Sequence, residues 1–348
     1  MKIFHLGGVA VAAIVAVLGS AGFAANADAQ TCEVSRTIKF AGNDWASNSF
    51  HVEVARIILE KGYGCRTESV PGTTQPLLNA LARGDVDVNM ELWKDNNVEI
   101  WAKMVKTGRA METKGVSIKG AVQGWFVPRY MVEGDKKRGI KAVAPGLKNV
   151  SDLPKHKALF RDPEQPAMGR FYNCKLGWNC EAVNSKKFVA YGLNKHYTNF
   201  KPGSGGALAA AIASAFKRGK PIVFYYWGPT WVLGKYDAVM LKEPAFDRAK
   251  WDKLDKAKSG KGLEAVAYPA IRVTIAVNAK FAKSAPNIVT FFDKYRMQDA
   301  MVSAALVVMR EKKDKTGRKA AMSFMRKHPD VWAKWLPAAV AKRVKEAL

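Results

Sequence analysis

Tryptophan is the residue type through which this sequence points to chemistry. Five of its ten tryptophans lie in short apolar segments, directly after them or in a turn: Trp45, Trp93, Trp125, Trp178 and Trp227. Large aromatic rings at strand ends project into the crevice where open α/β sheets bind ligands. Core packing is the better explanation for a single tryptophan, and Trp332 and Trp335 in a C-terminal helical segment fit that explanation. Several such rings from different parts of the chain favour one shared binding site.

The ligand that several indoles suit best is a cation without hydrogen-bond donors. The face of an indole is electronegative, and each contact with a cation contributes about 0.5–2 kcal/mol. A quaternary ammonium group has no N–H to donate, so few other types of side chain bind it. If the same ligand carries a carboxylate, the backbone N–H groups of the turn Trp178-Asn179-Cys180, ahead of a helix expected near Glu181, are suitable donors.

An exported enzyme is the main alternative to a binding protein, and the motifs of the common enzyme classes are missing. Gly203-Ser204-Gly205-Gly206 breaks the spacing of a nucleophile elbow, and Ser204 is better placed to cap a helix. There is no HExxH motif, phosphate-binding loop or dinucleotide fingerprint. The sequence therefore predicts no catalytic residue, no cofactor and no metal site. A binding module that signals to a receptor is a third possibility, which the sequence leaves open.

Composition and charge narrow the class of protein further. The chain has 348 residues, 48% of them hydrophobic and 25% charged, which is typical of a folded globular protein. Its net charge of +26 is spread along the whole chain, most densely over 312–319. Since no nucleic-acid recognition motif accompanies the charge, we expect a solvated basic surface and no nucleic-acid partner. Attraction to anionic lipid headgroups is the functional alternative.

The N-terminus has the pattern of a secretory signal. Lys2 precedes the apolar run 9–18, and small residues follow up to Ala29. We predict a signal peptide over 1–29, cleaved after Ala29, and a periplasmic location. The alternative, an uncleaved anchor helix, is disfavoured because the run is short for a bilayer.

Export permits disulfides, and the four cysteines allow three pairings. Cys174 and Cys180 share one short turn-rich segment, while Cys32 and Cys65 flank the first strand and helix. Local pairing, Cys32–Cys65 and Cys174–Cys180, is therefore favoured over crossed pairings or free thiols. A rigid Cys174–Cys180 turn would lower the ordering cost of ligand binding.

Periodicity predicts alternating strands and helices. We expect strands over 37–40, 65–70, 86–91, 120–128, 221–226 and 265–277. We expect helices over 47–61, 76–83, 98–106, 206–216, 288–295, 302–309, 319–328 and 331–348, the last one broken at Pro337. This pattern predicts an α/β fold with doubly wound, mostly parallel sheets flanked by helices.

A break in composition divides the chain into two lobes. The segment 133–150 is charged and rich in Gly and Pro, as expected of a linker, and the strand 265–277 is expected to return to the first lobe. We therefore predict lobe 1 over 30–132 plus 266–348 and lobe 2 over 133–265.

Five segments resemble the glycine betaine/proline betaine-binding proteins of ABC importers. They are GDVDVNMELW (84–93), AVQGWFVP (121–128), GRFYNCKLGWNCEAVN (169–184), PIVFYYWGPTW (221–231) and LKEP (241–244). The resemblance covers essentially the whole mature chain. It implies a two-lobed periplasmic binding protein fold (type II-like), with a ligand cleft between lobes that close over the ligand.

The resemblance also implies a set of site residues and partners. Trp93, Trp178 and Trp227 would box the trimethylammonium group, and the backbone amides of Asn179 and Cys180 would hold a carboxylate. Further aromatic contacts would come from Trp45, Trp125 and Tyr226. The implied function is transport of an osmolyte of the glycine betaine/proline betaine type, as an osmoprotectant or nutrient, by a monomer that delivers it to an ABC permease in the inner membrane. The alternative is a receptor for choline or another methylated or protonated amine.

The segment after Trp93 differs from the sequence pattern of this family. Some betaine-binding members carry a histidine a few residues after the first box tryptophan, where this chain has Trp93-Lys94-Asp95-Asn96-Asn97. Glu91 and Asp95 lie nearby instead. These acids suit a cation without its own carboxylate, such as choline, or an amine, although a surface acid or a helix cap is an equal alternative.

Overall fold

A computed structural model describes Met1 and residues 32–348, and the predicted signal peptide and its cleavage site lie outside the described residues. The first elements are β1 (Ile38–Asn43), α1 (Ala46–Gly62), β2 (Thr67–Gly72), α2 (Thr74–Arg83), β3 (Val88–Leu92), η1 (Lys94–Asn96), α3 (Val98–Lys106) and β4 (Ala110–Pro128). The middle of the chain forms α4 (Arg129–Glu133), η2 (Lys136–Arg138), η3 (Val150–Phe160), β5 (Gly169–Tyr172), α5 (Asn179–Ala190), η4 (Leu193–Lys195), β6 (Tyr197–Phe200), α6 (Gly205–Arg218), β7 (Val223–Gly228), α7 (Trp231–Lys235), β8 (Ala238–Met240) and α8 (Arg248–Lys256). The last elements are β9 (Ile271–Asn278), α9 (Ala279–Ser284), α10 (Pro286–Lys294), α11 (Asp299–Glu311), α12 (Arg318–Lys327), α13 (Pro329–Trp332), η5 (Ala333–Trp335) and α14 (Ala338–Glu346).

The strands follow one path, in the order β2-β1-β3-β9-β4-β7-β5-β6, with β8 paired to β4. At each end of this path the pairs are parallel, β2-β1-β3 and β7-β5-β6. In the middle, β9 pairs antiparallel to β3 and β4, and β4 pairs antiparallel to β7. The sheet is therefore mixed rather than mostly parallel, because strands β4 and β9 carry the chain between the two halves.

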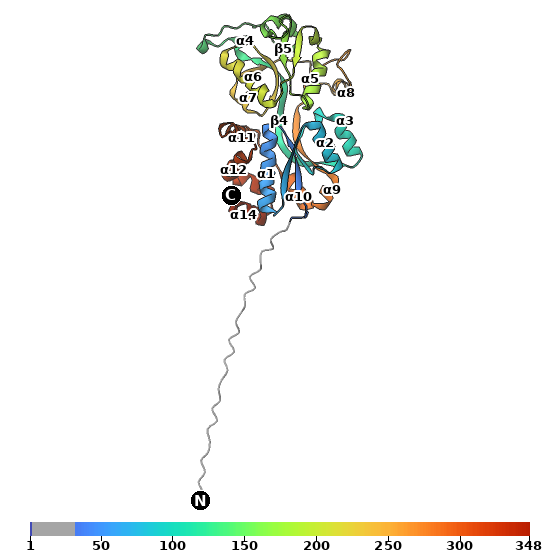
Figure 1. The fold of residues 1–348 in the computed structure, drawn as a ribbon, viewed down its shortest axis with the longest axis vertical. Helices are drawn as coiled ribbons and strands as arrows, with labels where there is room; N and C mark the ends of the chain where they lie inside the picture. The colour runs from blue at the N-terminus through green and yellow to red at the C-terminus, as the bar shows by residue number, and fades with distance from the viewer. Residues whose placement is uncertain (2–31) are drawn as a thin grey trace. The chain divides into compact units, whose positions relative to one another are not determined.

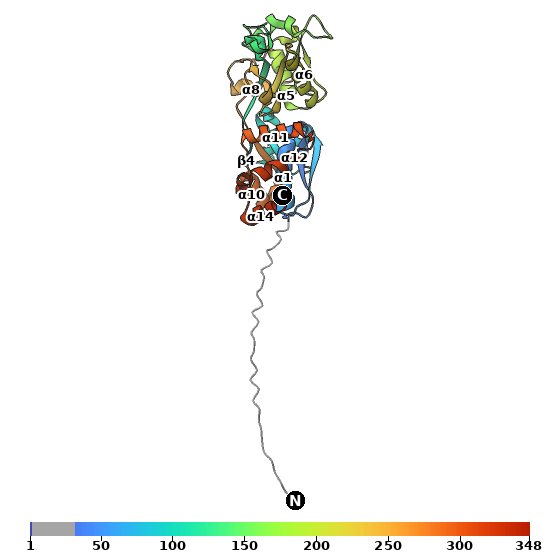
Figure 2. The ribbon, with the colours of Figure 1, turned by 90° about the vertical axis from the view of Figure 1, so that its left-hand side faces the viewer.

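Strand β4 belongs to both halves of the fold. Its residues 110–121 pair with β9, and its residues 122–126 pair with β7. Both views place α5, α6 and α8 in one half of the fold and α1, α11, α12 and α14 in the other (Figures 1 and 2). We call the half with α1–α3 and α9–α14 the first lobe, and the half with α4–α8 the second lobe.

Each lobe buries its own hydrophobic core. In the first lobe, α1 packs against β1 and β3 and against α11, α12 and α14, with Phe40, Phe50 and Trp332 fully buried. In the second lobe, β4, β5 and β7 pack against α5 and α6 around Trp125 and Phe171. No helix among the described residues is long and apolar enough to cross a membrane.

Three sequence predictions about local structure need correction. The expected linker 133–150 is packed on the second lobe, since its apolar residues Ala144 and Leu147 are buried in that core. Strand β4 begins at Ala110, ten residues before the expected start, because charged residues and glycines obscure its apolar pattern. The expected strand 265–277 begins only at Ile271, and Pro269, which has no N–H to donate, lies in the part that is not a strand. The break at Pro337 is confirmed, since α14 begins directly after it.

The cysteines form the two local disulfides, Cys32–Cys65 and Cys174–Cys180. The first ties the segment ahead of β1 to the end of the loop after α1. The second closes the turn that leads into α5, and this turn reaches the candidate site described below.

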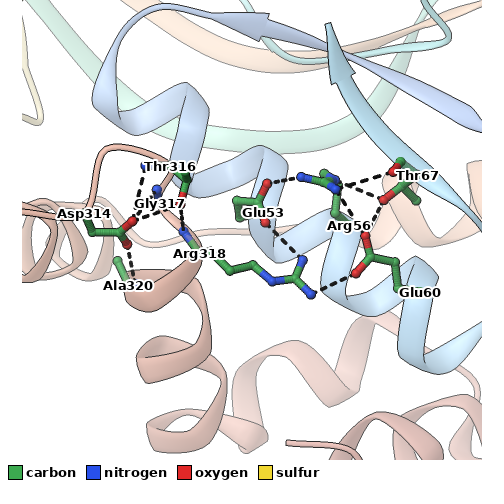
Figure 3. Close-up of polar contacts among 9 residues, drawn as sticks. All are labelled: Glu53, Arg56, Glu60, Thr67, Asp314, Thr316, Gly317, Arg318 and Ala320. Carbon is green, nitrogen blue, oxygen red and sulfur yellow. Dashed lines mark hydrogen bonds and ion pairs between the residues drawn. The ribbon is translucent and has the colours of Figure 1, made fainter.

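An ion-pair network fixes α12 to α1 (Figure 3). Glu53 on α1 is only 5% exposed and pairs with Arg56 and Arg318. Arg318, at the start of α12, also donates to Glu60 at 2.8 Å. Asp314, in the loop before α12, accepts the backbone N–H groups of Gly317 and Ala320 at 3.0 Å each. The densest basic segment of the sequence, 312–319, is thus organised by an acid at its centre.

Replacing Arg318 with methionine is expected to lower the free energy of unfolding by about 1–3 kcal/mol, because buried Glu53 loses a charge-assisted partner. Urea unfolding followed by circular dichroism measures this loss. Lys342→Met is the control, since the Lys342–Glu346 pair is exposed and its atoms are 3.9 Å apart. Equal stability of the two variants would contradict the role given to Arg318.

Candidate functional site

A cavity lies where the ends of β1 and β3 meet the second lobe, and indole rings dominate its wall. It is lined by Asn43, Trp45, Thr74, Leu78, Asn89, Glu91, Leu92, Trp93, Asn96, Asn97, Gln123, Trp178, Asn179, Cys180, Tyr225 and Trp227. Trp45 follows β1 and Trp93 follows β3, so parallel strands bring both rings to one edge of the first-lobe sheet. Trp178 and Trp227 come from the second lobe, in the turn before α5 and in β7.

A buried carboxylate holds both first-lobe tryptophans. Glu91, in β3, is 2% exposed, and its Oε2 accepts the indole N–H of Trp45 at 2.7 Å and of Trp93 at 3.0 Å. Burial raises the pKa of Glu91, and the hydrogen bonds from Trp45, Ser47 and Trp93 oppose that rise. The two rings are therefore fixed by one side chain, which leaves their faces free to line the cavity.

The second-lobe tryptophans complete the wall through ring contacts. The ring of Trp178 meets Trp45 edge to face at 5.9 Å and Trp227 at 5.2 Å, with interplanar angles of 83° and 86°. The indole N–H of Trp178 donates to Asp44 of the first lobe. Gly205, at the start of α6, makes room for this ring, because a Cβ there would lie 2.6 Å from it.

The turn that carries Trp178 also presents backbone donors. Trp178 caps α5, and Asn179 and Cys180 are its first residues. The first N–H groups of a helix have no acceptor within the helix and carry its positive dipole end. The Cys174–Cys180 disulfide closes this turn, and both Asn179 and Cys180 line the cavity.

Two of the expected aromatic contacts lie elsewhere. Trp125 is fully buried in the second-lobe core, stacked on Phe171 at 4.1 Å, and its N–H donates to Asn184. Tyr226 faces a neighbouring cavity beside α6 and α7. The residue of that segment lining the tryptophan cavity is Tyr225, because alternate strand residues share a face and Trp227 is two positions further on.

Gln123 is a site residue that the sequence prediction missed. It lies opposite Trp227 in the β4–β7 ladder, on the same face as Trp125 but two residues nearer the cavity. Its Oε1 accepts from the hydroxyl of Tyr225 at 2.7 Å and from Asn96 at 2.8 Å. The pairing register, which becomes known only with the fold, is the signal that identifies it.

The sequence matches the substrate-binding domain of ABC-type glycine betaine transport systems (OpuAC) over residues 36–327. The chain belongs to this family. It is 27% identical over 262 residues to the glycine betaine/proline betaine-binding periplasmic protein of Escherichia coli K12, covering 73% of each chain. It is 26% identical over 240 residues to the glycine betaine-binding periplasmic protein OusX of Dickeya dadantii, covering 66% and 67%.

Solved structures share the two-lobed fold of this substrate-binding domain. An ABC-transporter choline-binding protein in complex with choline has a TM-score of 0.70 at 17% identity, covering 89% of this chain and 97% of that one. The glycine betaine, L-proline-binding protein ProX of Borrelia burgdorferi has a TM-score of 0.68 at 18% identity, covering 89% and 100%. At these identities the likeness shows the fold, and the site must be argued from this chain's own residues.

The two lobes of this substrate-binding domain contact each other around the cavity. Gln75 of α2 donates to Asn179 of α5 at 2.9 Å. Asp95, two residues after Trp93, pairs with Arg248 of α8 at 2.8 Å, and its backbone carbonyl accepts the indole N–H of Trp251 at 2.8 Å. Asp95 does not line the cavity, so of the two acids noted near Trp93 only Glu91 does.

Trp125→Phe is expected to lower the free energy of unfolding by about 1–3 kcal/mol, because it leaves a void beside Phe171 and removes a donor from buried Asn184. Urea denaturation measures the change. Val122→Ala in the same strand is the control, since Val122 is 47% exposed and its truncation should cost little. A Trp125→Phe protein as stable as Val122→Ala would show that Trp125 is not a core residue.

Proposed function

We propose that this chain is the exported receptor of an ABC importer and binds a quaternary ammonium compound between Trp45, Trp93, Trp178 and Trp227. The observation that carries the proposal is the cavity wall, to which each lobe contributes two tryptophans. The family to which the chain belongs, and the ligands named for its relatives, support the same class of compound.

The orientation of the rings suits a methylated cation. Trp45, Trp93 and Trp178 direct their N–H groups to the carboxylates of Glu91 and Asp44, so their polar edges are satisfied by the protein. What remains for the ligand is the electronegative ring face, and each cation–ring contact contributes about 0.5–2 kcal/mol. An oxygen at the other end of the ligand would accept from the amides of Asn179 and Cys180.

Closure of the two lobes over the ligand is the proposed mechanism. A ligand that touches both lobes in the closed state alone favours that state by the difference in affinity. The contacts of Asp44 with Trp178, of Gln75 with Asn179 and of Asp95 with Arg248 form when the lobes meet. We place the lobes near the predicted boundaries, 30–132 plus 266–348 and 133–265, with the first crossing inside β4.

The location and partners follow from the proposed role. We propose a periplasmic monomer, exported by its signal peptide, that delivers its ligand to an inner-membrane permease. The periplasmic location named for two relatives supports this proposal. Because the family consists of transport proteins, we propose binding without turnover.

Trp178→Ala and Trp227→Ala are each expected to weaken binding at least tenfold, equivalent to about 1.4 kcal/mol, because each removes one wall of the cage. Isothermal titration with glycine betaine, proline betaine and choline measures the affinity, and tryptophan fluorescence reports the accompanying spectral change. The unsubstituted protein should bind at least one of these compounds with micromolar or higher affinity.

Trp101→Phe is the matched control, since Trp101 lies on α3 in a separate core cluster and does not line the cavity. It should bind as the unsubstituted protein does. Undiminished binding by both Trp178→Ala and Trp227→Ala would remove the cage from the proposal.

Arg248→Met is expected to weaken binding up to about fivefold, because it removes an exposed ion pair that forms between the lobes on closure. The loss should appear in the dissociation rate measured by stopped-flow fluorescence. Arg129→Met is the control, since Arg129 forms exposed ion pairs with Glu133 and Asp237 within the second lobe. A dissociation rate unchanged by Arg248→Met would contradict a role for this pair in closure.

A further inference from the structure

The buried carboxylate of Glu91 is more than a support for two rings. Its Oε2 accepts both indole N–H groups and the Ser47 hydroxyl lies close to the carboxylate, but no basic side chain within hydrogen-bond distance pairs with its buried Oε1 among the described residues. A buried carboxylate without a cationic partner destabilises the protein, and a bound cation would offset this unfavourable free energy. Glu91 lines the cavity, so its charge acts on a bound ligand, although its Oε1 faces the buried His51 ring.

No protein cation neutralises Glu91 within the described part of the chain. The titratable groups facing it are His51 of α1, with Nε2 4.0 Å from Oε1, and Tyr295 after α10, which contacts His51 Nδ1 at 2.8 Å. Burial lowers the pKa of His51 to about 3, so its ring is neutral at physiological pH. Lys94 is paired with Glu112, and Arg248 with Asp95.

A second oxygen in the cavity also lacks a donor. The backbone N–H of Glu91 donates to Asn89 Oδ1 at 3.1 Å, which fixes that atom as the oxygen. Asn43 Nδ2 donates to the same oxygen at 3.4 Å, so Asn43 is oriented with its Oδ1 free, and this atom is buried without a partner among the described residues. A ligand hydroxyl is able to donate to such an oxygen, whereas a ligand carboxylate is not.

The remaining cavity wall is equally unsuited to a carboxylate. The described residues that line it include no lysine, arginine or histidine, and the polar ones besides Glu91 are mostly carboxamides. The helix amides of Asn179 and Cys180 are acceptable donors to a hydroxyl oxygen as well as to a carboxylate. The net charge that the cavity offers a ligand is therefore negative.

We propose that Glu91 selects ligands by net charge, so that the site prefers a hydroxylated quaternary monocation of the choline type over a zwitterionic betaine. The inference rests on the proposed function and narrows its ligand class. A monocation receives the full attraction of Glu91, whereas the carboxylate of a betaine is repelled and cancels part of it. Glu91 and Asn43 thereby act as specificity-determining residues.

The test compares choline with glycine betaine by isothermal titration on the unsubstituted protein and on Glu91→Gln, which keeps the shape of the side chain and removes its charge. The unsubstituted protein should bind choline more tightly. Glu91→Gln should weaken choline binding at least tenfold and glycine betaine binding less than threefold. Glu112→Gln, which removes an acid outside the cavity, should leave the preference unchanged.

Equal losses for both ligands in Glu91→Gln, or none, would overturn charge selection and leave Glu91 a support for Trp45 and Trp93. Tighter binding of glycine betaine by the unsubstituted protein would overturn it too. Binding of neither ligand to the unsubstituted protein would instead overturn the proposed function.

A pH titration of the unsubstituted protein tests the same inference if Glu91→Gln does not fold. Burial raises the pKa of Glu91, and a bound cation favours its ionised form. Choline affinity should therefore rise with pH until Glu91 is ionised in the free protein, with a smaller rise for glycine betaine. Equal pH dependence for the two ligands would contradict the inference.

Discussion

The hydrogen bond from an indole N–H to a carboxylate is the interaction on which the rest of the site depends. Three of the four cavity tryptophans make it: Trp45 and Trp93 donate to Glu91, and Trp178 donates to Asp44. An indole held by its polar edge has a defined orientation, and its face is left for the ligand. Of the two acids only Glu91 is buried and lines the cavity, so the orientation of Trp45 and Trp93 and the charge of the site have one origin.

The ends of strands and one turn position these acids and rings around the cavity. Parallel β1 and β3 end side by side, which brings the residues after β1 next to Glu91 and Trp93. The α5 turn, closed by its disulfide, and strand β7 present Trp178 and Trp227 from the other lobe. Strand β4 lies between, paired with β9 on one side of the cavity and with β7 on the other, so the two lobes share a continuous backbone path.

The sequence predicted the positions of Trp45, Trp93, Trp178 and Trp227 because ends of strands and a short turn are visible in local patterns. Trp125 and Tyr226 do not line the tryptophan cavity, and the sequence could not indicate this, because the face of a strand residue and its depth depend on the pairing register, which is a property of the whole sheet. The linker expected over 133–150 was misjudged for a related reason, since charged residues around Ala144 and Leu147 conceal their burial. The roles of Glu91 and Asn43 depend on which of their side-chain oxygens have hydrogen-bond partners in the fold. The amino-acid sequence alone does not show these partners.

Asp95 connects the segment that carries Trp93 to the second lobe. Asp95 is contacted by Arg248 and Trp251 of α8, and only Lys94 separates it from Trp93 in the chain. The segment that carries Trp93 is therefore held by α8 of the second lobe outside the cavity as well as by Glu91 within it. Arg248 is half-exposed, with 51% of its side chain accessible. One end of this contact between the lobes therefore lies at the outer surface of the protein, and its other end lies two residues from a ring of the cavity wall.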